Sequence, residues 1–298
     1  MPYEAAPGPV RAWVERALGS QVVAASTQTG GFSPGVAARL VTASGRRAFV
    51  KAVGAELNDR SPELFRQEIV VMRALAALRL AHAPRFYDGY DDGGWVALLL
   101  EDVPGRTAYH PWTPDDARRV LDAVAELTAA LTPSPWPDAP VAAERSAEFL
   151  SRWKQIVADG IEVPDWLDGR LDEVAALADR GLAELATGDS LAHWDLRADN
   201  LLLTDDGRVV FVDWAWAARA ASWADQVIVQ SDMRVADDHP ALPDLPADDG
   251  IDGFIAAVAG GLWWGSLQPD PPGLPTLRRF QRESAEANFR WLRARLGW

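Results

Sequence analysis

The alternation of apolar and polar positions divides the chain into a strand-rich first third and a helical remainder. Apolar residues recur at helical spacing from Val10 to Leu18, and a glycine follows them. Beyond that glycine, five strand-like runs are separated by loops or short turn sequences, with one helical stretch from Ser61 inserted among them. The pattern over residues 20–101 therefore predicts a five-stranded, mainly antiparallel sheet with one helix. The five runs are QVVAAST, VAARLVTA, RRAFVKAV, RFYDGY and WVALLLED.

After the segment EDVPGR the pattern becomes helical. Thr113 and Asp116 form a capping box before a strongly periodic helix. We therefore expect an α+β chain with a first lobe over residues 1–101, a connector over 102–106 and a larger, mainly helical lobe over 107–298. Further helices are predicted near residues 145–158, 168–186, 222–234, 250–262 and 275–296.

The composition excludes several classes of partner. The chain has 298 residues and a formal net charge of −14, which disfavours binding to nucleic acid. No apolar run approaches the roughly 20 residues of a membrane helix, and the first residues lack the pattern of a signal peptide. Cysteine is absent, which fits a reducing compartment. We expect a cytoplasmic protein without a membrane partner.

A predicted hairpin over residues 201–212 brings polar side chains together at its open end. With a two-residue turn at Asp206-Gly207, Asn200 falls opposite Asp213, whereas a three-residue turn would shift this register by one. A carboxylate and an amide oxygen suit Mg²⁺, which binds one or two carboxylates together with substrate phosphates. The hairpin therefore predicts a magnesium site.

Asp195 lies five residues before Asn200. A second carboxylate near such a metal could accept the proton of an attacking hydroxyl group. Asp and Asn residues also cap loops, which is their commoner role. The joint pattern of His-x-Asp-x4-Asn, hairpin and Asp favours a catalytic site over isolated caps.

The segments HWDLRADN and FVDWAW resemble the catalytic loop and the metal-binding Asp of aminoglycoside phosphotransferases and their eukaryotic-type kinase relatives. The resemblance covers about residues 20–230 and implies a bilobal protein-kinase-like fold. It implies that Asp195 is the catalytic base and that Asn200 and Asp213 bind Mg²⁺. His193 occupies a structural position of that loop.

The resemblance also assigns a nucleotide-binding role to the first lobe. Lys51 is one of only two lysines in the chain, with Lys154, and it resembles the strand-borne lysine that holds nucleotide phosphates. Glu68 is the best candidate for its ion-pair partner. Glu63 is possible too, although an acidic residue in the first turn of a helix is explained by the helix dipole.

Two further segments complete the expected nucleotide site. The segment TGGFSPGVAARL resembles the loop over the phosphates, and the connector LLLEDVPGR resembles the segment that meets adenine or guanine through the backbone. The residues expected to contribute are Gly30, Gly31, Ser33 and Gly35 from the loop, and Glu101 to Val103 from the connector.

The chain departs from the family pattern near the catalytic base. Trp194 stands where the antibiotic kinases commonly have glycine. Arg197 stands where protein kinases have lysine, and it either contacts the transferring phosphate or forms a structural ion pair with Asp199 or a neighbour. The segment after Asp213 is too short for a protein-kinase activation loop. Asp225 resembles the helical Asp that anchors the catalytic loop.

These observations favour a small-molecule kinase that uses ATP or GTP and Mg²⁺. The segment 237–252 carries six Asp and no Lys or Arg, so we expect an aminoglycoside-like or other cationic antibiotic as the hydroxylated acceptor, and antibiotic resistance as the outcome. The alternatives are a metabolic kinase of the choline, homoserine or sugar type, and a catalytically silent kinase-like binding protein. The residues proposed for the acceptor are Asp237, Asp238, Trp263 and Trp264, although a solvated acidic loop and a tryptophan-rich core explain them equally simply.

Overall fold

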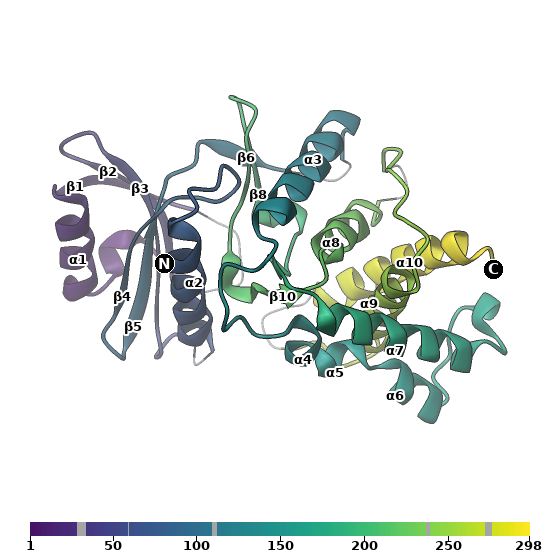
Figure 1. Cartoon of the computed structure of the whole chain (residues 1–298). Helices are drawn as coiled ribbons and strands as arrows, with labels where there is room; N and C mark the ends of the chain where they lie inside the picture. Colours follow the sequence, from purple (N-terminus) through teal and green to yellow (C-terminus); the bar gives the residue numbers. More distant parts are fainter. Residues whose placement is uncertain (29–33, 59, 109–111, 237–238, 272–275) are drawn as a thin grey trace. The chain divides into compact units, whose positions relative to one another are not determined.

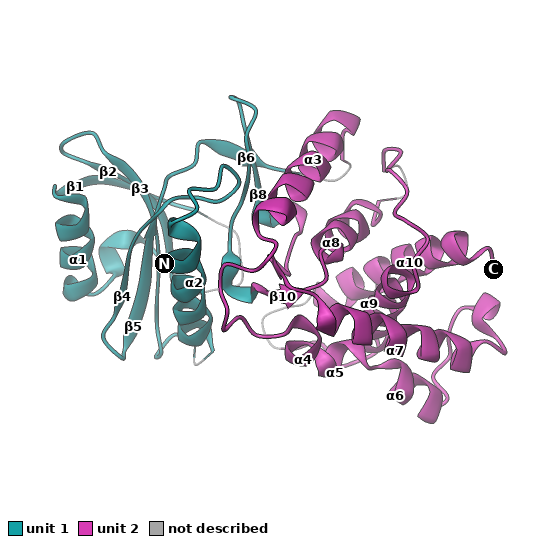
Figure 2. Ribbon diagram, viewed as in Figure 1, with its two compact units in different colours: residues 1–108, 199–216 teal, residues 109–198, 217–298 magenta. Residues whose placement is uncertain are grey.

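Figure 1 shows the computed structural model, which describes residues 1–28, 34–58, 60–108, 112–236, 239–271 and 276–298. The chain divides into two units, coloured separately in Figure 2. The first unit contains residues 1–108 and 199–216, and the second contains residues 109–198 and 217–298. The predicted lobe limits at residues 101 and 107 stay a prediction.

The first unit is built on a five-stranded antiparallel sheet with the order β1-β2-β3-β5-β4. This arrangement confirms the predicted sheet. Its strands are β1 (Val22–Thr27), β2 (Val36–Thr42), β3 (Arg47–Gly54), β4 (Phe86–Asp91) and β5 (Trp95–Leu100), and its helices are α1 (Gly8–Leu18) and α2 (Ser61–Ala76).

The two faces of strand β3 have different neighbours because successive side chains of a strand point to opposite faces. Val50 and Ala52 are fully buried in a core that includes Val10 and Val14 of α1. Lys51, between them, points to the other face, where Glu68 of α2 lies. The alternation of the strand therefore sets the position of the lysine.

The predicted hairpin is present, but its predicted register is wrong by one residue. Strand β8 (Leu201–Thr204) pairs with β9 (Val209–Phe211) so that Leu201 faces Phe211, and the N–H of Val212 donates to the carbonyl of Asn200. The turn contains three residues, because Gly207 at a φ of 91° donates its N–H to Thr204. Strand β6 (Gly105–Thr107) pairs with β8.

The second unit is mainly helical, as predicted. The helix expected over residues 145–158 is instead three short helices, with breaks at Ser146 and Ser151, a residue type that favours turns over helix interiors. The elements are α3 (Pro114–Ala130), α4 (Ala142–Arg145), α5 (Ala147–Leu150), α6 (Trp153–Ala158), α7 (Leu171–Thr187), β7 (Ser190–Ala192), β10 (Ala218–Ala220), α8 (Ala224–Met233), α9 (Asp249–Ser266) and α10 (Leu277–Leu296).

Helix α9 is the central helix of the second unit's core. It crosses α7 so closely that a Cβ added at Gly253 would lie 2.2 Å from the carbonyl oxygen of Leu177. The indole of Trp153 donates to the carbonyl of Ala256, and the largest buried side chains include Trp153 and Phe254. In the described part of the chain, no helix is both long enough and apolar enough to cross a bilayer.

Candidate active site

Lys51 lies between two carboxylates of the first unit. Its Nζ is 2.6 Å from Oε2 of Glu68 and 2.9 Å from Oδ1 of Asp213. Glu63, the other candidate partner, instead pairs with Arg66 at 3.6 Å. Burial lowers the pKa of Lys51, but Asp213 and Glu68 more than offset this effect, so the pKa is raised and the ammonium stays charged.

Glu68 is the buried member of this cluster, with a side chain only 1% exposed. Burial raises its pKa above the ordinary value, while the Lys51 ammonium and a backbone hydrogen bond from Trp214 act in the opposite direction. The residue is therefore held by Lys51 on one side and by the segment after Asp213 on the other.

Asn200 and Asp213 flank the hairpin at its two ends. Asn200 is buried, whereas the side chain of Asp213 is 47% exposed and can reach a ligand. Asp213 has a φ of 68°, which is uncommon for a residue other than glycine. The carboxylate already faces the Lys51 cation, and a carboxylate with an amide oxygen is a donor set suited to Mg²⁺. The residues present therefore fit the predicted metal.

Gly35 is the member of the predicted phosphate loop that the structure describes. A Cβ at this position would lie 2.1 Å from the carbonyl oxygen of Ala52, so only glycine permits this approach to the strand that carries Lys51. The other predicted loop residues, Gly30, Gly31 and Ser33, lie outside the described residues.

Two connector residues use one backbone group each in a hydrogen bond within the first unit. The N–H of Glu101 donates to the carbonyl of Arg85, and the carbonyl of Val103 accepts a hydrogen bond from Arg39. In the described ranges, the carbonyl of Glu101 and the N–H of Val103 take part in no hydrogen bond.

The predicted catalytic loop is anchored to α8 by two carboxylates. Asp225 accepts hydrogen bonds from the N–H groups of His193, at 2.7 Å, and Trp194, at 3.0 Å. Burial raises the pKa of Asp225 to about 6, although both hydrogen bonds act to lower it. Asp232 accepts the N–H of Ala198 at 3.2 Å.

The role of Asp232 was not anticipated from the sequence. It follows Asp225 by seven residues, which is two helical turns, so both carboxylates lie on the same face of α8. The seven-residue spacing of these two acidic residues on one predicted helix was the sequence signal that could have identified Asp232.

Asp195 lines a cavity of about 270 Å³ within the second unit. One of its oxygens lies 3.7 Å from the guanidinium of Arg197. Arg197 therefore forms an ion pair with a neighbour two residues away, the proposed base itself. An ion pair with Asp199 or a neighbour was one of its two predicted roles, and contact with the transferring phosphate was the other. Most of the cavity's lining comes from helices far apart in the sequence, which is why no motif pointed to it.

Trp194 has a φ of 69°, in the left-handed region that favours glycine. This backbone conformation gives a physical reason for the glycine that resembling kinases commonly have there. In this chain the indole stacks on Phe254, with ring centroids 5.5 Å apart, and donates to the hydroxyl of Ser146 at 2.9 Å. These contacts offset a backbone cost of about 1–2 kcal/mol.

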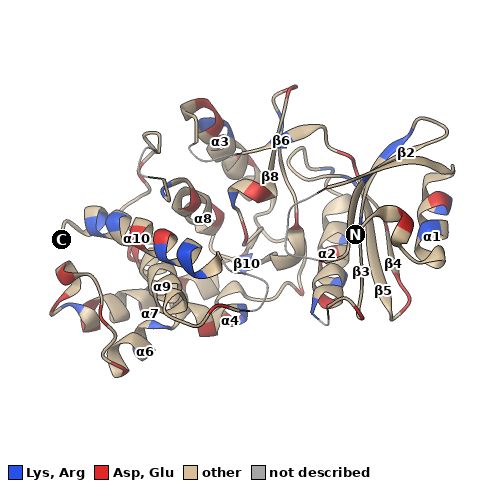
Figure 3. Ribbon diagram, turned by 180° about the vertical axis from the view of Figure 1, so that it is seen from behind, with Lys and Arg blue, Asp and Glu red and all other residues tan. Residues whose placement is uncertain are grey.

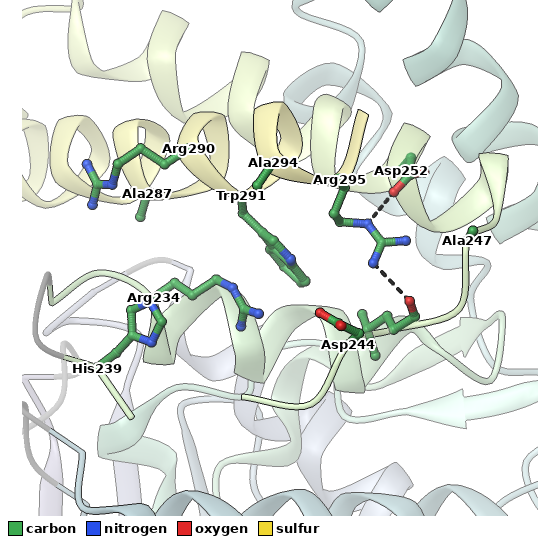
Figure 4. A pocket seen from close by; sticks show the side chains of 11 residues that line it. Arg234, His239, Asp244, Ala247, Asp252, Ala287, Arg290, Trp291, Ala294 and Arg295 are labelled. Atoms are coloured by element: carbon green, nitrogen blue, oxygen red, sulfur yellow. Dashed lines mark hydrogen bonds and ion pairs between the residues drawn. The ribbon is translucent and has the colours of Figure 1, made fainter. Parts of the chain in front are cut away.

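The acidic segment 237–252 makes several structural contacts. Asp248 caps α9, Asp249 pairs with Arg180 at 3.3 Å, and Asp252 pairs with Arg295. Figure 4 shows the last pair in a second cavity of about 630 Å³, where Asp244 also lies. Asp237 and Asp238 lie outside the described residues.

The two proposed substrate tryptophans lie away from the cavity that contains Asp195. Trp263 is buried, and its indole donates to the carbonyl of Glu162 at 3.0 Å. Trp264 lies under the guanidinium of Arg152, 3.7 Å from the ring centroid. Neither lines that cavity.

Comparisons with known proteins agree with this description. Residues 29–258 match the family described as "Phosphotransferase enzyme family". A thermostable mutant of aminoglycoside phosphotransferase APH(4)-Ia, in a ternary complex with ADP and hygromycin B, has a TM-score of 0.61 at 14% identity, with 94% of this chain and 98% of that chain covered. No curated protein sequence matches the chain.

Two other solved structures are similar. An aminoglycoside phosphotransferase from Alicyclobacillus acidocaldarius subsp. acidocaldarius DSM 446 has a TM-score of 0.56 at 16% identity, with 94% and 95% of the two chains covered. The amicoumacin kinase hAmiN, in complex with AMP-PNP, Ca²⁺ and Ami, has a TM-score of 0.55 at 13% identity, with 88% of each chain covered. The family match confirms the resemblance, and the structures confirm the predicted bilobal kinase-like α+β fold.

Proposed function

The chain belongs to the phosphotransferase enzyme family, and from this premise we propose that it transfers the γ-phosphoryl group of ATP or GTP to a hydroxyl group of an antibiotic. The observation that carries this proposal is the Lys51 ammonium, held by Glu68 and Asp213. A lysine ordered by a helix-borne glutamate is the arrangement that protein kinases need for phosphoryl transfer.

The proposed reaction is an in-line displacement. The acceptor oxygen forms a bond to the γ-phosphorus, while the bond between that phosphorus and the oxygen that bridges to the β-phosphate breaks. The nucleoside diphosphate leaves with the electron pair, and the hydroxyl proton passes to the carboxylate of Asp195 and then to solvent. Lys51 would hold the nucleotide phosphates, and the carbonyl of Glu101 and the N–H of Val103 would hold the base.

Asn200 and Asp213 would hold Mg²⁺. When bound, the ion supplies positive charge that offsets the charge of the phosphates in the transition state. The Lys51 ammonium donates a hydrogen bond to Asp213, so it would place a second positive charge beside the proposed metal site. A requirement for ATP or GTP and the absence of cysteine are consistent with the predicted cytoplasmic location.

An antibiotic acceptor is supported by the similar structures, since two of them are complexes, one with hygromycin B and one of an amicoumacin kinase with Ami. Mass spectrometry of a panel of hydroxylated antibiotics and metabolic alcohols, incubated with Mg²⁺ and each nucleotide, tests the proposal. We expect one phosphoryl group on at least one antibiotic and an equal amount of diphosphate. Binding of Mg-nucleotide without any product would instead indicate a silent nucleotide-binding protein.

A further inference from the structure

The cavity beside Asp195 is mainly apolar and aromatic. Its lining includes side chains from α5, the catalytic loop, α8, α9 and α10, namely Phe149, Trp194, Ile228, Val258, Leu262 and Phe280. Phe149 and Phe280 are 37% and 36% exposed, so aromatic surface of this cavity is accessible to a ligand. Exposed apolar surface in a concave site is typical of a ligand-binding pocket.

Charge is sparse in this lining. Only Asp195, Asp232 and Arg197 are charged among the described residues that form it, which gives a formal net charge of −1. Arg197 already pairs with Asp195, and Asp232 accepts a backbone N–H of the catalytic loop. An acceptor with several ammonium groups would lose its hydration here without finding a carboxylate for each group.

Helix α9 contributes no charged residue to this lining. Its two acidic residues, Asp249 and Asp252, lie in the first turn, and it has neither Lys nor Arg, whereas α10 carries several (Figure 3). The remaining turns present Val258 and Leu262 to the cavity. The hydroxyl of Ser231 and the amide of Asn288, also in the lining, hydrogen-bond to each other.

Trp194 contributes aromatic surface to the same cavity. Its indole is kept next to the catalytic base despite a backbone conformation that favours glycine. The ring lines the cavity and stacks on Phe254, which lines it too. A glycine would relieve the backbone and leave the cavity without this aromatic wall.

We propose that the acceptor places an apolar, ring-containing group in this cavity and its reacting hydroxyl group at Asp195. The substrate class is therefore a neutral, amphiphilic alcohol and not a polycationic aminoglycoside. An engineered cavity of about 150 Å³ binds benzene, so a cavity of about 270 Å³ accommodates more than one ring. This inference rests on the proposed phosphotransfer and narrows its acceptor.

Calorimetric titration of the full chain, with ADP and Mg²⁺ present, tests this class directly. The probes are 2-naphthylmethanol, a neutral aromatic alcohol, and hygromycin B, an aminoglycoside. Leu262→Glu places a carboxylate in the lining, and Leu267→Glu makes the same change at an exposed position, 49% accessible, outside it. Val258→Thr repeats the test with a hydroxyl group in nearly the same volume, in case Leu262→Glu does not fold.

We expect the naphthyl alcohol to bind to the wild type and to Leu267→Glu, and to bind at least about tenfold more weakly to Leu262→Glu or Val258→Thr. Absence of binding by the naphthyl alcohol, or equal binding to all variants, would overturn the inference. So would hygromycin B binding that is tighter than that of the naphthyl alcohol and improves in Leu262→Glu. Failure of phosphoryl transfer with every acceptor, despite binding, would instead reject the proposed function and leave the apolar pocket intact.

Discussion

Lys51 and Lys154 are the two lysines among 29 basic residues, and they have different surroundings. Lys51 is 15% exposed and contacts Glu68 and Asp213, whereas Lys154 is 69% exposed and contacts Asp179. A compact ammonium fits between these two carboxylates, whereas a guanidinium is wider and planar and presents its donors in a fixed fork. The chain uses arginine nearly everywhere else, so the exception at position 51 has a physical reason.

Lys51→Arg should therefore weaken nucleotide binding although it preserves the charge. We expect the dissociation constant for Mg-ATP or Mg-GTP, measured by calorimetry, to rise at least about tenfold, because the guanidinium cannot reach both carboxylates and the phosphates in one geometry. Lys154→Arg is the matched control and should leave the constant unchanged. Equal affinities in both variants would remove Lys51 from the nucleotide site.

Asp225 should make the stability of the chain depend on pH. Its pKa of about 6 in the folded protein exceeds the ordinary value of 3.8, so the folded state favours the protonated form. The resulting stabilisation is fully present below about pH 3.8 and is lost as the pH rises through 6.

The free energy of unfolding of the wild type, relative to Asp225→Asn, should fall by on the order of 3 kcal/mol between pH 4 and pH 7, with most of the loss below pH 6.5. Urea denaturation across this range measures the difference. Asp205→Asn, which removes an exposed carboxylate in the hairpin turn, is the matched control. A constant difference between wild type and Asp225→Asn would contradict the raised pKa.

At the scale of elements, the strands and helices followed from periodicity, but their detailed pairing did not. The hairpin after the catalytic loop was predicted in position and wrong in register, because Gly207 closes a three-residue turn and not a two-residue one. Both turns are compatible with the sequence Asp205-Asp206-Gly207, so local chemistry alone did not decide between them. Asn200 consequently lies opposite Val212 and not opposite Asp213, which is the next residue along the chain.

The crossing of α7 and α9 depends on two glycines that face each other, Gly181 and Gly253. An alanine normally stabilises a helix relative to glycine, but a Cβ at Gly253 would lie 2.2 Å from a backbone oxygen of α7. Gly253→Ala should therefore lower the free energy of unfolding by about 1–3 kcal/mol.

Thermal or urea unfolding measures this effect, and Gly8→Ala is the matched control, since a Cβ at Gly8 meets no atom within 4 Å. A Gly253→Ala chain as stable as the wild type would show that the helices separate without cost. Because α9 also lines the cavity beside Asp195, the same variant should weaken binding of the naphthyl alcohol.

At the scale of the whole molecule, the sequence predicts the catalytic loop better than the acceptor site. His193 and Asp195 belong to one short motif, and Asp225 was assigned to the same loop by the resemblance to known kinases. The cavity proposed for the acceptor draws on five separate elements, and no local pattern links Phe149 to Phe280. The acidic segment 237–252 was the visible signal for a cationic acceptor, yet three of its described carboxylates serve a helix cap and two ion pairs.

The most direct test of the proposed mechanism is single-turnover transfer of a labelled γ-phosphoryl group to an accepted alcohol by the wild type, Asp195→Asn and Asp205→Asn. Asp195→Asn should slow transfer by about 10²–10⁴-fold, because a neutral amide cannot take the hydroxyl proton, while its affinity for Mg-nucleotide stays within about twofold. Asp205→Asn should match the wild type. Transfer by Asp195→Asn at the wild-type rate would contradict the assignment of Asp195 as the catalytic base.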